Sequence, residues 1–309
     1  MTDATNPRRT LPPNAVFTDW PAPDGLKLRR MDWRQPPGAP ARGSLLFIGG
    51  RGDFIEKYLE IHRWFHTAGW NVTTFDWRGQ GKSERGAEGA NYLSFDPLIE
   101  DLAALIADWR EGSSGPHVAI AHSMGAHMLL RTLVDKAPAL DAVVLVAPML
   151  EVNSKPFPPM LAPWIARFMT LIGQRDRPLA KAPTHGPRRQ RALTGGSPER
   201  YEDETWWWQR EPGYSVGTPS WGWLTAAFRS AARTFTAAKL AQVQTPVLIL
   251  ATEIDRLVGI DAVRRTAAAL PHAELHVYPD SAHEILREAD SFRLDALARI
   301  AAFFDERAR

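Results

Sequence analysis

One serine stands where a strand-like apolar run gives way to a helix-like segment. The run VAIA at 118–121 ends just before Ser123, with Ala121 two residues before this serine and Gly125 two residues after it. Small side chains at both positions permit the tight turn that lifts a serine hydroxyl above a parallel sheet. The next helix would point its N-terminal N–H groups toward negative charge developing near that hydroxyl. We therefore predict that Ser123 is a nucleophile and not merely a helix cap.

An acid and a histidine follow this serine, each just past the end of another apolar run. The run at 247–251 leads to Asp255, and the run at 275–278 leads to His283. Serine, acid and histidine in this order form the catalytic triad of one class of serine hydrolases with parallel sheets. In such a triad the acid orients the histidine, which takes the proton of the attacking serine. Glu151, which follows a further strand-like run, is the alternative acid.

A glycine-rich segment follows the first apolar run of the core. Gly49-Gly50-Arg51-Gly52 contains three glycines in four residues, which allows the backbone to approach a bound substrate closely. In hydrolases of this kind such a loop supplies one oxyanion N–H, and the residue after the nucleophile supplies the other. We expect the backbone N–H groups of Arg51 and Met124 to form the oxyanion hole. A flexible loop or a phosphate-binding nest is the alternative, whereas a dinucleotide site lacks its glycine spacing and its acidic residue.

Short apolar runs without regular polar alternation are typical of strands buried on both faces of a parallel sheet. Such runs lie at 45–48, 72–75, 118–121, 143–146, 247–251 and 275–278. Helical periodicity lies between or after them at 54–68, 97–109, 262–270 and 291–304. The alternation predicts an α/β fold with a mostly parallel, doubly wound sheet. Near the N-terminus, the segments 15–18 and 27–33 flank a turn at Asp24-Gly25 and predict an antiparallel hairpin.

Residues 151–238 interrupt this alternation and contain no convincing strand-like run. Six of the 12 tryptophans lie here, at Trp164, Trp206, Trp207, Trp208, Trp221 and Trp223. We predict a helical cap over 151–238, inserted into a core formed by 1–150 and 239–309. All six are candidates for substrate binding, and some of them are predicted to line the apolar inner face of the cap, where the substrate's acyl chain would lie. A basic stretch at 175–191 either faces an anionic headgroup or membrane surface or forms a solvated loop.

Three motifs resemble those of the α/β-hydrolase superfamily, and most closely those of its monoacylglycerol lipase and bacterial lysophospholipase branch. The branch motif HGxGEHxxRY corresponds to GGRGDFIEKY at 49–58, DxRGxGxS to DWRGQGKS at 76–83, and GHSMGG to AHSMGA at 121–126. Gly49 replaces the motif's histidine, which helps to shape the oxyanion loop. The resemblance implies an α/β-hydrolase fold. It also implies a serine esterase that cleaves monoacylglycerols or lysophospholipids through an acyl-enzyme, without a metal or another cofactor.

The amino-acid composition argues against several classes of protein and of functional site. The 309 residues include 37 basic and 35 acidic side chains, a net charge of +2, which argues against a general nucleic-acid-binding protein. The absence of cysteine excludes disulfides, a cysteine nucleophile and thiolate metal sites. No apolar run is long enough to cross a bilayer, and no signal-peptide pattern is present. We expect a cytoplasmic protein, with peripheral contact with the inner membrane face left open.

Other activities of the superfamily stay open at this point, namely a proline-iminopeptidase-type peptidase, a cofactor-free haloperoxidase and a small-ester esterase. A non-catalytic binding module is a further alternative, which the presence of all three triad residue types disfavours. His62 and His66 have metal-like spacing, but no third ligand accompanies them, and we expect a solvated helix face. We expect packing to orient His122, and we expect His127 to make a contact within the core or with the cap. Asp76 is expected to brace its own glycine-rich turn through backbone N–H groups.

Overall fold

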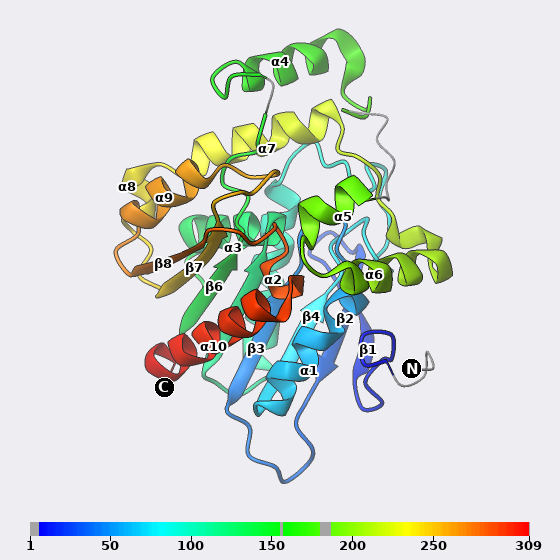
Figure 1. Ribbon diagram of the computed structural model, residues 1–309, viewed down its shortest axis with the longest axis vertical. Helices are drawn as coiled ribbons and strands as arrows, with labels where there is room; N and C mark the ends of the chain where they lie inside the picture. Colours follow the sequence, from blue (N-terminus) through cyan, green and yellow to red (C-terminus); the bar gives the residue numbers. More distant parts are fainter. Residues whose placement is uncertain (1–5, 155–156, 180–186, 309) are drawn as a thin grey trace.

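Eight strands form one sheet in the computed structural model, which describes residues 6–154, 157–179 and 187–308 (Figure 1). In chain order they are β1 (Val16–Pro21), β2 (Lys27–Trp33), β3 (Gly43–Ile48), β4 (Trp70–Phe75), β5 (His117–His122), β6 (Ala142–Val146), β7 (Val247–Thr252) and β8 (Ala273–Tyr278). Across the sheet their order is β1-β2-β4-β3-β5-β6-β7-β8. The six apolar runs all lie in core strands, and each strand is one or two residues longer than its run.

β1 and β2 form the expected N-terminal hairpin, in which Val16 pairs with Asp32 and Pro21 with Lys27. Gly25 in the turn has a φ of +87°, a conformation that glycine adopts without strain. β2 also pairs antiparallel with β4, and every later pairing in the sheet is parallel. The predicted combination of a mostly parallel sheet with an antiparallel hairpin is confirmed.

Helices cover both faces of the sheet, which explains why its strands are apolar without alternation. In β3, for example, Phe47 belongs to the core on one face and Leu46 to the core on the other. The first face is covered by α1 (Leu59–Thr67) and α10 (Asp290–Arg307), and the second by α2 (Asp96–Glu111), α3 (Met124–Lys136) and α9 (Ile260–Ala269) (Figure 1). The helix predicted at 54–68 begins as a 3-10 turn, η2 (Ile55–Tyr58), which leads into α1.

The order of strands reverses between β3 and β5, so two loops from distant parts of the sequence leave the sheet together. Ile48 at the end of β3 pairs with Ala121 near the end of β5. The glycine-rich segment that follows Ile48 therefore lies beside the residues that follow β5. In open parallel sheets such a reversal point is where ligands bind.

The segment between β6 and β7 is mainly helical in its described residues. It contains α4 (Ala162–Met169), a π turn (Thr170–Gln174), α5 (Pro187–Leu193), α6 (Pro198–Arg210), the 3-10 turn η4 (Pro212–Tyr214), α7 (Trp221–Thr234) and α8 (Ala237–Leu240). Where the structure describes this segment, its β pairing is limited to two isolated bridges, Val152 with Val258 and Pro178 with Ser220. α7 packs on the core through Trp223, and α4 lies beyond α7, away from the sheet (Figure 1).

Candidate active site

Ser123 occupies a strained turn between β5 and α3. Its φ of +52° and ψ of −114° form a conformation that residues with side chains rarely adopt. Backbone hydrogen bonds hold the turn, because the Ser123 N–H donates to the Val146 carbonyl (2.9 Å) and its carbonyl accepts from the His127 N–H (3.1 Å). A Cβ on Gly125 would lie only 2.3 Å from the Gly49 carbonyl oxygen. The glycine at 125 thus lets the helix start closely against the glycine-rich loop.

His283 and Asp255 meet at the hydroxyl of Ser123. Nε2 of His283 lies 2.9 Å from Ser123 Oγ, and Nδ1 lies 2.7 Å from Asp255 Oδ2. Since a carboxylate only accepts hydrogen bonds, Nδ1 carries the proton, and Nε2 is left to accept the proton of the serine. The other carboxylate oxygen, Oδ1, accepts the backbone N–H groups of Leu257 (2.7 Å) and Val258 (3.1 Å). The structure thus brings the three predicted triad residues together in the order that a proton transfer requires.

The electrostatics of these three residues favour a charged acid beside a basic histidine. Burial tends to raise the pKa of Asp255, but the charge and hydrogen bond of His283 outweigh burial, and the pKa lies below its ordinary value. Burial also opposes protonation of His283, yet the charge and hydrogen bond of Asp255 raise the pKa of His283 above its ordinary value. A histidine with a raised pKa is a stronger base, and it is neutral only above that pKa.

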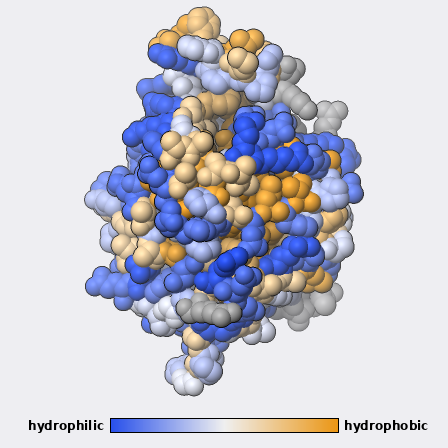
Figure 2. Space-filling view, turned by 90° about the vertical axis from the view of Figure 1, so that its left-hand side faces the viewer, coloured by the Kyte–Doolittle hydropathy of each residue, from blue (hydrophilic) through white to orange (hydrophobic). Residues whose placement is uncertain are grey.

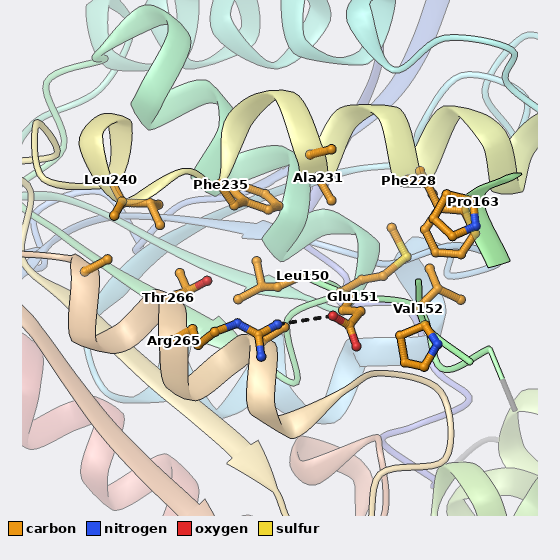
Figure 3. A pocket seen from close by; sticks show the side chains of 17 residues that line it. Leu150, Glu151, Val152, Pro163, Phe228, Ala231, Phe235, Leu240, Arg265 and Thr266 are labelled. Atoms are coloured by element: carbon orange, nitrogen blue, oxygen red, sulfur yellow. Dashed lines mark hydrogen bonds and ion pairs between the residues drawn. The ribbon is translucent and has the colours of Figure 1, made fainter. Parts of the chain in front are cut away.

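Glu151, the alternative acid, faces a different pocket. Figure 3 shows its carboxylate paired with Arg265 of α9, at 3.2 Å. Its backbone carbonyl accepts the N–H of Gly259 at 3.0 Å. The pocket around this ion pair is lined by apolar side chains such as Leu150 and Phe235. Because Nδ1 of the triad histidine is already bonded to Asp255, the geometry favours Asp255 over Glu151 as the acid.

The glycine-rich loop is held directly beside the nucleophile. Trp77 Nε1 donates to the Gly49 carbonyl at 2.7 Å, and Asp53 Oδ2 accepts the N–H of Gly50 at 2.5 Å. A Cβ on Gly50 would lie 3.1 Å from the Cβ of Ser123. The loop is therefore fixed by Trp77 and Asp53 although it lacks the histidine of the related motif at position 49.

Two backbone N–H groups beside Ser123 have no acceptor among the residues that the structure describes. The N–H of Gly50 is bonded to an aspartate, and that of Gly52 donates to the side chain of Gln80. Between them, the N–H of Arg51 has no acceptor in the part of the chain that the structure describes. The same holds for the N–H of Met124 in the first turn of α3. Unbonded donors beside a nucleophile are suited to bind a developing oxyanion.

A buried cluster of charges supports the oxyanion loop and the histidine loop. Lys57 Nζ lies 2.6 Å from Asp53, 2.6 Å from Glu284 and 3.4 Å from Glu204 of α6. Arg287 belongs to the same cluster, because it forms ion pairs with Glu204 at 2.7 Å and with Glu284. Although burial opposes ionisation, Arg287 and Lys57 lower the pKa of Glu284 to about 2. The cluster thus ties core and cap together around the site.

His122 connects this cluster to the turn at Ser123, which it directly precedes. Its Nδ1 lies 2.9 Å from the Tyr58 hydroxyl and 3.2 Å from Asp53 Oδ2. Its ring centre lies 5.0 Å from that of His283. Hydrogen bonds therefore hold His122 in addition to the packing expected for it, and the residue also lines the cavity that contains Ser123.

Sequence reasoning assigned no role to most members of the cluster. Two members lie next to predicted site residues in the sequence: Lys57 is part of the GGRGDFIEKY motif, and Glu284 directly follows the triad histidine. Their positions in the sequence therefore indicated that they lie near the site. Their partners Glu204 and Arg287 lie in other segments, and no local spacing marks the pairing. Such a network becomes visible only when the segments are brought together in space.

A cavity of about 1060 Å³ lies over Ser123 and His283. Much of its wall is apolar and comes from both the core and the segment 151–238: Met149, Val152, Leu193, Trp208, Val216, Trp223, Leu257 and Val258. Of the six tryptophans predicted to bind substrate, Trp208 and Trp223 line this cavity. An apolar wall next to a nucleophile suits the acyl chain of an ester.

The other four candidate tryptophans lie elsewhere, so the prediction that some of the six line the substrate site is limited to Trp208 and Trp223. Trp164 on α4 is 67% exposed, and Trp221 packs against the core at the start of α7. Trp206 and Trp207 contact each other edge-on at 4.9 Å, and Trp207 Nε1 donates to the Arg8 carbonyl at 3.0 Å. Successive helix residues point about 100° apart, so three consecutive tryptophans cannot all face one cavity.

The expectation of a solvated helix face was wrong for His62. This residue is buried, with its ring 5.1 Å from Phe47 in an edge-on contact. Burial lowers the pKa of His62 to about 3. The reason is that α1 turns this side toward the sheet. His66, one turn later, stacks on Trp33 with ring centres 4.0 Å apart.

The expected roles of His127 and Asp76 are confirmed. Nδ1 of His127 lies 2.7 Å from the Met149 carbonyl and Nε2 lies 2.8 Å from Ser230 Oγ of α7. This histidine therefore links α3 to the segment between β6 and β7. Asp76 Oδ2 accepts the N–H of Lys82 at 2.9 Å, which braces the glycine-rich turn at 76–83.

Comparison with known proteins identifies relatives over most of the chain. The family model of Hydrolase_4, described as serine aminopeptidase, S33, matches residues 39–290. The chain is 25% identical over 287 residues to a probable lysophospholipase L2 of Haemophilus influenzae, a match that covers 91% of this chain and 89% of the relative. It is 28% identical over 276 residues to lysophospholipase L2 of Escherichia coli, covering 83% of this chain and 78% of the relative.

Solved structures show the same fold. A soluble variant of monoglyceride lipase from Saccharomyces cerevisiae, in complex with a substrate analogue, aligns with a TM-score of 0.77 and 17% identity, covering 98% of both chains. The monoacylglycerol lipase of Paleococcus ferrophilus aligns with a TM-score of 0.68 and 20% identity, covering 90% of this chain and 98% of the other. The architecture of this chain is therefore that of the α/β-hydrolases.

Proposed function

Because this chain belongs to the Hydrolase_4 (serine aminopeptidase, S33) family of α/β-hydrolases, we propose that it hydrolyses carboxylic esters through an acyl-enzyme formed on Ser123. The observation that carries this proposal is the hydrogen-bonded series Ser123, His283 and Asp255 beside a large, mostly apolar cavity. The protein is an ester hydrolase of the lipase or lysophospholipase type, and its substrate is a single-chain lipid ester. The relatives named lysophospholipase L2 support this class.

The proposed reaction uses the geometry of the site directly. Ser123 Oγ attacks the ester carbonyl while His283 Nε2 takes its proton, and Asp255 stabilises the imidazolium that forms. The N–H groups of Arg51 and Met124 bind the oxyanion. His283 then gives the proton to the leaving alcohol. A water molecule deprotonated by the same nitrogen releases the fatty acid from the serine.

We also propose that the segment 151–238 is the cap of this site, over a core formed by 1–150 and 239–309. Side chains from both parts line the one cavity that contains the nucleophile, and the cap supplies Leu193, Trp208, Val216 and Trp223. The cap thus completes the binding surface for the acyl chain.

The value of kcat/KM is expected to rise with acyl length from C2 through about C8. Each buried CH₂ contributes roughly 0.8 kcal/mol. Four more methylenes therefore raise kcat/KM by about two orders of magnitude when this burial is expressed in the transition state. The measurement uses p-nitrophenyl esters from C2 to C16 below their micellar limits, beside a monoacylglycerol and lysophosphatidylcholine. Trp223→Ala should flatten the rise, whereas Trp164→Ala, on the exposed side of α4, should leave it unchanged.

Two outcomes would contradict this substrate class. A profile that peaks at acetate would favour a small-ester esterase. Turnover of proline amides in preference to all esters would favour the peptidase activity that is the alternative within the superfamily.

α4 and its flanking turns carry an exposed strip of large hydrophobic residues. Figure 2 shows hydrophobic residues gathered at the top of the molecule, where α4 lies. The strip consists of residues that are each more than half exposed: Met160, Leu161, Trp164, Phe168, Leu171 and Ile172. In the described part of the chain no helix is long and apolar enough to span a membrane. We propose that this strip rests on a lipid surface, such as the inner membrane face, from which the substrate enters.

The variant Trp164→Ser/Leu171→Ser is expected to bind lipid vesicles about tenfold or more weakly than the wild type, because it removes two exposed apolar side chains from the strip. Co-sedimentation with phosphatidylcholine vesicles measures the bound fraction. Hydrolysis of soluble p-nitrophenyl butyrate should stay unchanged. Leu294→Ser, on the exposed side of α10, is the matched control. Equal vesicle binding by the wild type and the double variant would contradict the proposal.

A further inference from the structure

Three arginines line the active-site cavity without a carboxylate partner among the residues that the structure describes. They are Arg51 of the oxyanion loop and Arg189 and Arg191 of α5. The absence of such a pair leaves their positive charge facing the cavity.

The remaining charges of the wall are already matched. Asp53 and Glu284 are the two acidic residues that line the cavity, and both are bonded to Lys57 at 2.6 Å. These side chains belong to the buried cluster that also contains Glu204 and Arg287. They therefore do not neutralise the three arginines.

The side chain of Arg51 is held in place by uncharged groups. Nη1 donates to the Gly217 carbonyl (2.8 Å) and Nη2 to Asn91 Oδ1 (3.2 Å). The guanidinium carbon lies 5.4 Å from the centre of the Trp223 ring. Nε is buried and has no acceptor in the described residues. Burial above all, and repulsion by Arg189, lower the pKa of Arg51 to about 10. Such an unpaired cation is costly to hold, and a bound anion would offset the cost.

α5 is attached directly to the loop that carries the triad histidine. The N–H of His283 donates to the Ala192 carbonyl (3.4 Å), and the N–H of Glu284 donates to the Leu193 carbonyl (2.8 Å). Ala192 and Leu193 also line the cavity. The two arginines of α5 lie within about one or two helical turns of these contacts, which places their charge close to the reacting ester.

We propose, on the basis of the proposed esterase function, that Arg51, Arg189 and Arg191 form an anion subsite for the phosphodiester of a single-chain phospholipid. A guanidinium can offer two parallel N–H groups to phosphate oxygens. In a lysophospholipid, the glycerol unit separates this phosphate from the ester, so the acyl chain can lie on the apolar wall while the phosphate meets the arginines. The enzyme accordingly prefers lysophospholipids to uncharged monoacylglycerols.

The first experiment compares lysophosphatidylglycerol with a monoacylglycerol of the same acyl chain, both below their micellar limits. The wild type is expected to show a kcat/KM about tenfold or more higher for the phospholipid, since charge-assisted hydrogen bonds contribute to its binding. Arg189→Gln/Arg191→Gln should lose most of this preference. High salt should weaken the preference in the wild type, because the two arginines of α5 are exposed.

Arg177→Gln is the matched control for this comparison. Arg177 is an exposed arginine in the same basic stretch and does not belong to the cavity wall. Its variant should keep the wild-type preference for the phospholipid. An equal loss in the control and in Arg189→Gln/Arg191→Gln would overturn the proposal, because it would indicate a general charge effect.

A binding experiment separates the subsite from the proposed reaction. Calorimetry on Ser123→Ala protein should show tighter binding of lysophosphatidylglycerol than of monoacylglycerol, and Arg189→Gln/Arg191→Gln in the same background should abolish the difference. That difference in binding supports the anion subsite whether or not the wild type hydrolyses esters. If the wild type hydrolyses no ester, only the proposed function is overturned. Equal binding of the two lipids would overturn the subsite.

Inorganic phosphate distinguishes a lipid headgroup from a free anion. If phosphate inhibits hydrolysis of p-nitrophenyl butyrate and lysophosphatidylglycerol shows no preference, the arginines bind a free anion and the headgroup proposal fails. If phosphate competes with a preferred lysophosphatidylglycerol, both ligands share the subsite and the proposal is supported.

Discussion

Ser123→Ala protein is expected to lose ester hydrolysis and labelling by a fluorophosphonate probe together. The Oγ of Ser123 lies 2.9 Å from Nε2 of His283, so it is the hydroxyl from which this base can remove a proton. In triad hydrolases, loss of the serine lowers kcat on the order of 10⁶-fold. The rate is measured with p-nitrophenyl butyrate, and the adduct is measured by mass spectrometry of the intact protein and of its peptides.

Ser215 provides the matched control for the serine nucleophile. This residue lines the same cavity, but no hydrogen bond to His283 is observed for it in the described structure. Ser215→Ala protein should still carry one adduct, on Ser123. Labelling that persists in Ser123→Ala protein would reveal another nucleophile and contradict the proposed mechanism.

The fold was predictable because its elements differ in their apolar periodicity. The run at 118–121 has no polar alternation, and it forms the centre of β5, which is buried on both faces. The amphipathic tail forms α10 across one face of the sheet. The boundary between η2 and α1 was not predictable, because 3-10 and α-helical turns differ in hydrogen bonding rather than in their apolar pattern.

The three triad positions were predictable because each follows a strand of one parallel sheet, whose carboxyl ends meet at one edge. Contacts made by the cap were harder to predict. A count of tryptophans identifies an apolar segment, but it does not tell which side of α6 or α7 faces the cavity. For the same reason, the pairing of Lys57 with Glu204 and the burial of His62 became evident only in the assembled fold.

Asp255→Asn is expected to lower kcat on the order of 10⁴-fold, whereas Glu151→Gln should change it little. Asparagine keeps the shape of the side chain but no longer fixes the proton on Nδ1 of His283, and loss of that tautomer is the main cost in triad enzymes. Glu151 instead pairs with a largely exposed arginine of α9, at 3.2 Å, and surface pairs of this kind contribute little to stability. The measurement is kcat with the preferred p-nitrophenyl ester. A larger loss in Glu151→Gln than in Asp255→Asn would reassign the acid.

The pH dependence of kcat/KM tests the assignment of Asp255 as the acid independently of how much kcat falls in each variant. In the wild type, Asp255 raises the pKa of His283 above its ordinary value of 6.5, so kcat/KM should fall as the pH decreases through that raised pKa, where the base becomes protonated. In Asp255→Asn protein the attraction is gone while burial still disfavours the imidazolium, so the acidic limb should move to lower pH. Glu151→Gln should leave this limb where it is, because Glu151 does not contact the histidine. An acidic limb that moves in Glu151→Gln and stays in Asp255→Asn would show that the acid of the triad is Glu151.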